Sequence, residues 1–146
     1  MQGCFGAGMQ GGAAIARALS MGARDFTELA AWQLAHELRT LVIAITAKSP
    51  ARNDVRYCSQ IKDAARSAAS NIAEGFGRFR HRDFAHFLRM AVASLNEVRD
   101  NLIDGHVRRY VTDDELSRGT SLSKRAIGAT TRLIRYLTDN PDMPDS

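Results

Sequence analysis

This 146-residue sequence has little of what several protein classes require. Its two cysteines, Cys4 and Cys58, provide neither a disulfide framework nor a paired metal-ligand spacing. No stretch approaches the roughly 20 apolar residues that a membrane span needs. Near the N-terminus, glycines interrupt every apolar run and no positive charge precedes one, which is unlike a secretory signal. We therefore expect a soluble protein of a reducing compartment, the cytoplasm, with no membrane partner.

Glycine is distributed unevenly, and this divides the chain. Residues 1–24 hold six of the eleven glycines and only two charges, Arg17 and Arg24, so we expect a flexible leader there. Residues 25–140 are long enough for one domain with its own core and too short for two of ordinary size. Residues 141–146 make a short acidic tail.

Apolar residues recur at helical spacing in four segments, and no segment alternates as a strand would. The first segment, 28–48, ends at Ser49 because a residue that precedes proline avoids the α region. The second starts at an N-cap, Asp54, and ends near Gly75. The expected inward-facing residues of these two helices are Leu29, Trp32, Ala35, Leu38, Val42 and Ile45, then Cys58, Ile61, Ala65, Ala68, Ile72 and Phe76.

The third and fourth segments have equally clear periods. Gly105 either ends the third helix or is tolerated inside it, with the stop nearer Arg109. The fourth helix starts at a capping box, in which Thr112 and Glu115 each satisfy an orphaned backbone N–H. The expected core residues are Phe84, Phe87, Leu88, Ala91, Leu95, Val98 and Leu102, then Leu116, Thr120, Ser123, Ile127, Thr130, Ile134 and Leu137. Four amphipathic helices with short loops predict an all-α, antiparallel up-and-down four-helix bundle.

No set of residues in the sequence supports a chemical reaction. Residues 6–11 match the letters of a dinucleotide fingerprint, but no strand precedes them, so no cofactor is expected. The Glu-x-x-His pairs of bundle metal sites are absent, and Asp83 with His86 is a single pair, so no metal is expected. Nothing nominates a nucleophile together with a base and an oxyanion site. We predict a protein that is not an enzyme.

Positive charge is in excess, and arginine supplies most of it. The net charge of +4 includes three aspartates at the C-terminus, whereas residues 1–138 carry 20 basic and 13 acidic side chains, a balance of +7. Seventeen of the basic residues are arginine, whose planar fork matches phosphate. This balance either indicates an anionic partner, RNA or DNA, or reflects codon usage alone.

Two groups of basic residues are candidate phosphate contacts. The arginine ribbon lies on the side of the fourth helix opposite its isoleucines and consists of Arg118, Arg125, Arg132 and Arg135. It is either a binding surface or an ordinary solvated face. The loop cluster precedes the third helix and consists of Arg78, Phe79, Arg80, His81 and Arg82. Either its arginines grip phosphates while Phe79 stacks on a base, or Phe79 caps the bundle core.

A block between the second and third helices carries a family resemblance. It reads Asn71-Ile72-Ala73-Glu74-Gly75, followed by Arg78, Phe84, Phe87, Leu88, Ala91, Ser94 and Glu97. Together with upstream matches such as Trp32 and Pro50, the similarity covers roughly residues 25–138. In these positions the chain resembles the bacterial four-helix bundle proteins named after intervening sequences of 23S ribosomal RNA genes. It departs from them at Asp63, where the family has an arginine, and at Ala68-Ala69, where the family has Ile-Pro.

The resemblance implies a protomer that assembles into a ring-like homopentamer, in which one basic patch becomes a rim of five. A related branch, the accessory proteins of diversity-generating retroelements, is similar and is thought to engage nucleic acid and a reverse transcriptase. The family name reflects the location of the genes, so it does not imply binding to the ribosome.

Within the shared block, Asn71 and Glu74 lie three residues apart beside Gly75. We interpret them as structural residues that hydrogen-bond the loop and pair with Arg78, latching the second helix to the third. A role in subunit or ligand contacts is the alternative. For the whole protein we carry two hypotheses: an oligomeric bundle that binds RNA or DNA phosphates with little sequence preference, and a scaffold whose partner is another polypeptide.

Overall fold

The computed structural model describes residues 22–142, and this part of the chain contains helices and no strand. The leader expected over residues 1–24 lies almost entirely outside the described residues, and the acidic tail is described only to Asp142. The elements are η2 Phe26–Glu28, α2 Ala30–Ala47, η3 Ala51–Asn53, α3 Val55–Phe76, α4 His81–Val107 and α5 Asp113–Asp139. None of these helices combines the length and the apolar character that crossing a membrane takes.

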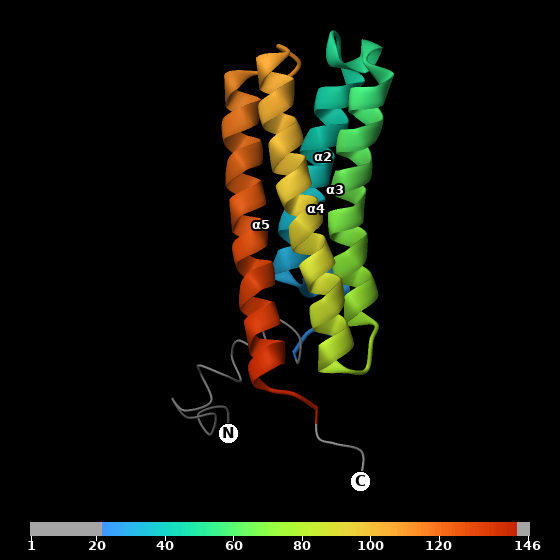
Figure 1. Ribbon diagram of the computed structural model, residues 1–146, viewed down its shortest axis with the longest axis vertical. Helices are drawn as coiled ribbons and strands as arrows, with labels where there is room; N and C mark the ends of the chain where they lie inside the picture. The colour runs from blue at the N-terminus through green and yellow to red at the C-terminus, as the bar shows by residue number, and fades with distance from the viewer. Residues whose placement is uncertain (1–21, 143–146) are drawn as a thin grey trace.

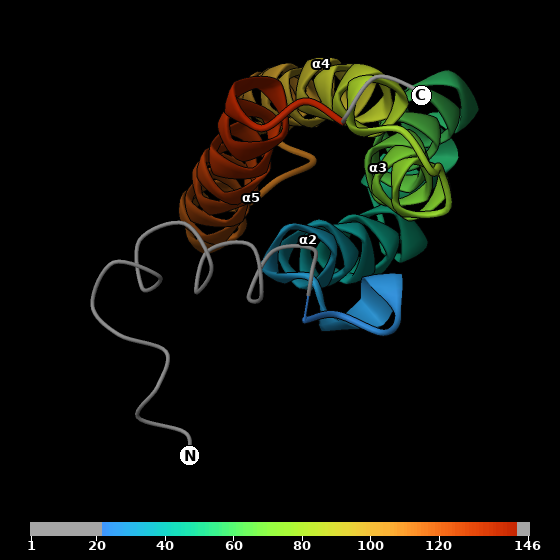
Figure 2. The same ribbon diagram turned by 90° about the horizontal axis from the view of Figure 1, so that it is seen from below.

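The four long helices stand side by side and alternate in direction (Figure 1). Seen from one end they make a four-sided arrangement (Figure 2). Each helix contacts the next one along the chain, and α5 returns to contact α2. The short connections make chain neighbours antiparallel. The predicted all-α, up-and-down four-helix bundle is confirmed.

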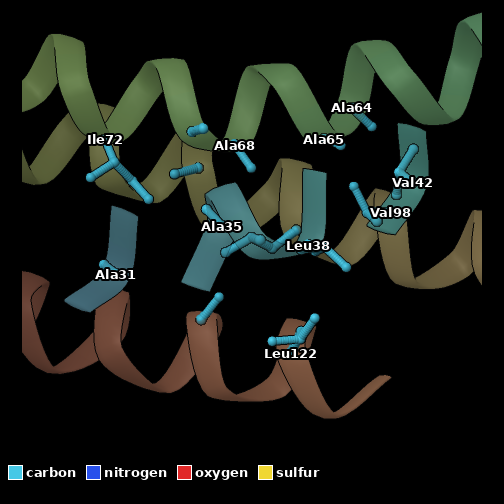
Figure 3. Close-up of a cluster of buried hydrophobic side chains, with 14 of the residues drawn as sticks. Ala31, Ala35, Leu38, Val42, Ala64, Ala65, Ala68, Ile72, Val98 and Leu122 are labelled. Atoms are coloured by element: carbon cyan, nitrogen blue, oxygen red, sulfur yellow. The ribbon is translucent and has the colours of Figure 1, made fainter. Parts of the chain in front are cut away.

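Large aliphatic side chains pack against small ones in the core. The buried face of α3 includes four alanines, which let the neighbouring helices approach closely: Ala64, Ala65, Ala68 and Ala69. Figure 3 shows side chains of α3 turned toward the interior that they share with Ala35 and Leu38 of α2. The inward-facing residues predicted for α2, α3 and α4 are buried, except for Trp32, Phe76 and Phe87, which are partly buried.

The core stripe predicted for α5 is confirmed only in part. Ser123, Thr130 and Leu137 are buried, whereas Leu116, Thr120, Ile127 and Ile134 are only partly buried. The two isoleucines lie at one edge of the packed face. The residues that α5 buries are Gly119, Leu122, Ser123, Ala126, Ala129, Thr130, Leu133 and Leu137. Apolar residues cover much of the circumference of α5, so their spacing alone does not fix which line points inward. Small residues on the buried side of α5 let its backbone lie close to the other helices. The isoleucines therefore lie at the edge of the packed face and not at its centre.

Both helix starts predicted from capping residues are confirmed. Asp54 accepts a hydrogen bond from the backbone N–H of Tyr57 at 3.0 Å and another from the Tyr110 hydroxyl at 2.8 Å. These two bonds lower the pKa of Asp54 from its ordinary value. At the start of α5, Thr112 Oγ1 accepts from the Glu115 N–H at 3.2 Å, and the Glu115 carboxylate accepts from the Thr112 N–H at 2.9 Å. Sequence capping rules therefore located these two starts correctly.

Two glycines let α3 and α4 meet closely at both ends of their contact. A Cβ added at Gly75 of α3 would lie 2.8 Å from Phe84 Cδ1 and 2.9 Å from Phe87 Cβ, both on α4. A Cβ added at Gly105 of α4 would lie 2.8 Å from Cζ of Tyr57 on α3. Side-chain carbons do not approach that closely without displacement, so each glycine is required by the ring that covers it.

Gly105 lies inside α4, and the helix ends through a left-handed residue, Arg109, at φ 65°. The Tyr110 N–H donates to the Gly105 carbonyl at 2.7 Å, and the Arg109 N–H donates to the His106 carbonyl at 3.1 Å. This is the Schellman arrangement, which normally places glycine where Arg109 stands. The ambiguity of the sequence is thereby resolved: the stop lies near Arg109, and Gly105 serves packing.

We predict that Arg109→Gly stabilises the protein by about 0.5–1 kcal/mol, because glycine adopts positive φ without the Cβ penalty. Thermal denaturation followed by circular dichroism measures the change. Arg108→Gly is the matched control: Arg108 has φ −79° and its Nε bonds Asp104 at 2.9 Å, so this change should lower the melting temperature. Equal shifts of the melting temperature in both variants would contradict the view that backbone strain is confined to Arg109.

Candidate functional site

The loop cluster, residues 78–82, joins α3 to α4 at one end of the bundle. Phe79 has an exposed fraction of 100%. It therefore does not cap the core, and that alternative is wrong. Phe79 stands beside a shallow hollow of about 540 Å³ whose lining consists of Ala73, Glu74, Gly77, Arg78, Phe79, Arg80 and Asp83. A bare aromatic ring, with an arginine on each side of it in the chain, borders a hollow at the surface.

The arginines of the loop cluster are held differently. Arg78 Nη2 donates to Glu74 Oε1 at 2.6 Å, and its guanidinium carbon lies 4.7 Å from the centre of the Phe87 ring. Both contacts fix the side chain while 46% of it stays exposed. Arg82 is exposed, and no carboxylate in residues 22–142 lies within ion-pair distance of it. Arg78 thus offers a fixed charge and Arg82 an adaptable one.

The arginine ribbon follows one flank of α5. Arg118 Nη2 lies 3.8 Å from Oε1 of Glu37 on α2, and a spacing of seven keeps Arg125 and Arg132 on this same flank. Relative to the residues that α5 buries, Arg118, Arg125 and Arg132 lie toward one edge of the packed face, and Arg118 contacts α2 there. Arg135 lies on the side of α5 that is opposite the packed face. Across the described part of the chain, Arg125, Arg132 and Arg135 have no carboxylate within ion-pair distance.

The structure brings only part of the two groups to one end. Because α5 runs antiparallel to α4, Arg132 and Arg135 lie toward the end of the bundle that holds the loop cluster, and Arg118 lies toward the other end (Figure 1). The two groups belong to different elements of the bundle. His81 of the loop cluster lies next to α5 at this end, with its ring centre 6.4 Å from that of Tyr136.

A third basic surface, which sequence reasoning missed, lies between α2 and α3. Its groove, of about 380 Å³, has an apolar floor and three cationic side chains and is lined by Arg39, Val42, Ile43, Lys62, Ala65 and Arg66. Ile43 is 52% exposed there. Lys62 and Arg66 are four apart on α3, which places them on one helix face. That spacing was the available signal, but Arg39 joins them only through the pairing of α2 with α3.

The residues of the family block have distinct structural roles. Asn71 Nδ2 donates to the Ser67 carbonyl at 2.9 Å and to Ser67 Oγ at 3.0 Å, and Ser94 Oγ of α4 donates to Ser67 Oγ at 2.9 Å. Asn71 therefore does not bond the loop as expected; it bonds its own helix at a serine contact with α4. Glu74 pairs with Arg78 as the spacing suggested. Gly75 permits a close approach of α4, because an added Cβ would lie 2.8 Å from Phe84 Cδ1.

Few other side chains within residues 22–142 are placed to support chemistry. No group of three or more histidine, cysteine or acidic side chains is placed to hold a metal ion in this range. Cys58 is buried, and burial raises the pKa of its thiol. Its Sγ lies 3.1 Å from the Ala51 carbonyl, which is consistent with a packed thiol. The dinucleotide-like residues 6–11 and Cys4 fall outside the described residues.

One comparison with known proteins is informative. A family model described as 23S rRNA-intervening sequence protein matches residues 27–129, which is most of the chain. This match confirms the resemblance carried by the block at residues 71–75. No curated protein matches the chain.

We predict that Gly75→Ala destabilises the bundle by about 1–3 kcal/mol, since the new methyl group must displace Phe84 or Phe87. Gly77→Ala is the control, because its Cβ would meet only the Glu74 carbonyl at 3.5 Å. Glu74→Ala should cost less than about 1 kcal/mol, because an exposed ion pair contributes little. Thermal denaturation of the three variants tests this order, and a Glu74 effect larger than the Gly75 effect would refute it.

Proposed function

Since the chain belongs to the 23S rRNA-intervening sequence protein family, we propose that it acts without catalysis, as a cytoplasmic bundle that binds RNA or DNA. The family description refers to a ribosomal RNA sequence, which is compatible with association with nucleic acid. The contacts we propose run to phosphates, through Arg78, Arg80 and Arg82 of the loop cluster and through the arginine ribbon. Such contacts give weak binding with little preference for sequence.

The observation that supports this function most directly is the full exposure of Phe79. Burying a phenylalanine side chain is worth about 1.5–3 kcal/mol, and this ring forgoes that gain in the unbound protein. Bases stack on aromatic rings with about 1–3 kcal/mol each, whatever their sequence. Arginines on either side of such a ring hold the backbone while the base stacks. The loop cluster has this combination, and a single-stranded nucleic acid, whose bases are free to stack, is the ligand that fits it best.

We further propose that the protein works as a homo-oligomer, the ring-like homopentamer that the family resemblance implies. Exposed apolar side chains support self-association, and those described are Ile43, Val55, Met90, Ile103 and Val107, in addition to Phe79. In a ring, five copies of a weak phosphate site act on one strand, and the affinities combine through the effective concentration. The same apolar side chains also favour the second candidate, a scaffold that binds a polypeptide partner.

We predict that Phe79→Ala weakens binding to single-stranded RNA of mixed sequence by about 5- to 100-fold, because one stacking contact is lost. Fluorescence anisotropy with labelled RNA at low salt measures this. The melting temperature should not change, since the ring packs against nothing.

Two controls accompany this variant. Phe79→Trp keeps a stacking surface and should bind as tightly as the wild type. Gln60→Ala removes an exposed side chain in the first half of α3, away from the loop cluster, and should have no effect. If Phe79→Ala binds RNA as tightly as the wild type, Phe79 does not stack on a base. Failure of all these proteins to bind RNA or DNA would leave the scaffold as the better function.

A further inference from the structure

The first turn of α4 is capped by Asp142, a residue that follows α5. Arg80, at the N-cap position, does not cap the helix with its side chain. The backbone N–H of His81 instead donates to Asp142 Oδ2 at 2.6 Å. The second oxygen, Oδ1, lies 3.7 Å from His81 Nε2. Figure 1 shows the C-terminal segment leaving α5 and passing toward the start of α4.

A second contact fastens the same segment. His81 Nδ1 lies 2.6 Å from the Asn140 carbonyl, and because a carbonyl only accepts, Nδ1 carries the hydrogen. Pro141 restricts the backbone between the two contacts. Residues 140–142 are thus held against His81 by both its main chain and its ring. This contact joins residues about sixty positions apart, since Asp142 and His81 are separated by 61 in the sequence.

The place that the Asp142 carboxylate occupies suits an anion. A helix N-terminus directs free N–H groups and a partial positive charge outward, and phosphate groups bind there readily. Here that terminus lies within the loop cluster, with Arg82 in its first turn and Phe79 two residues before His81. A carboxylate carries fewer acceptor oxygens and less charge than a phosphate but bonds the same N–H donors.

We propose that Asp142 stands in for a phosphate, so that the acidic C-terminal segment competes with nucleic acid for the loop cluster. This inference rests on the proposed function. RNA must displace residues 140–142 to reach the N-terminus of α4, and its apparent affinity is reduced by the fraction of molecules in which the segment is docked. The docked contacts are partly exposed, which keeps the competition weak enough to be overcome.

The test compares two variants that remove the same charge. Asp142→Ala releases the segment, whereas Asp139→Ala removes an exposed aspartate at the last position of α5. We expect Asp142→Ala to bind labelled single-stranded RNA about 3- to 10-fold more tightly than Asp139→Ala, the range expected when a cap-like contact is removed. Circular dichroism checks that both variants remain folded.

A second pair of variants is needed because loss of the cap could unfold the first turn of α4 in Asp142→Ala. Asp142→Asn keeps an acceptor for the His81 N–H but not the charge, and Asp139→Asn is its control. Tighter binding in Asp142→Asn than in Asp139→Asn supports competition. Equal affinities within both pairs, with RNA still bound, overturn the competition and leave the proposed function standing. Absence of RNA binding by the wild type and all variants at low salt overturns both.

Discussion

The approach of α3 to α4 at two glycines sets the geometry on which the rest of the molecule depends. Gly75 accepts two phenylalanine side chains of α4, and Gly105 accepts the ring of Tyr57 from α3. Residues 77–80 connect the two helices beyond Gly75. This connection is too short to fold back over the core, so Phe79 projects from the end of the bundle.

The charged surfaces follow from the same packing. Each helix uses one face for the core, and cationic side chains gather outside it at three places, which are the loop cluster, the groove between α2 and α3, and the arginine ribbon of α5. The described part of the bundle thus presents several modest cationic surfaces, two of them beside hollows of about 540 and 380 Å³. Extended polyanions suit such surfaces, because they reach several of them at once. Within this arrangement the carboxylate of Asp142, which follows α5, accepts a hydrogen bond at the N-terminus of α4.

The sequence was sufficient for the helices, their caps and the family, because these depend on local spacing. Asp54 and Thr112 act through backbone groups only three residues away, so their roles could be read directly. The buried line of α5 could not be predicted in the same way. Glycine and alanine determine which side of α5 lies closest to the bundle, but they carry no strong hydrophobic signal in the sequence. The exposure of Phe79, the α2–α3 groove and the Asp142 contact depend on which helices are neighbours, and no local pattern contains that information.

A salt series shows whether the bundle binds nucleic acid through phosphates. Affinity for single-stranded RNA and duplex DNA is measured between about 50 and 200 mM salt, with the solution mass recorded alongside. The account predicts a steep, linear fall of log affinity with log salt. In Arg125→Glu with Arg132→Glu the slope should be shallower by about two, whereas Arg52→Glu with Arg56→Glu should leave it nearly unchanged. Affinity that is independent of salt, or no binding by a well-formed oligomer at low salt, would contradict the account.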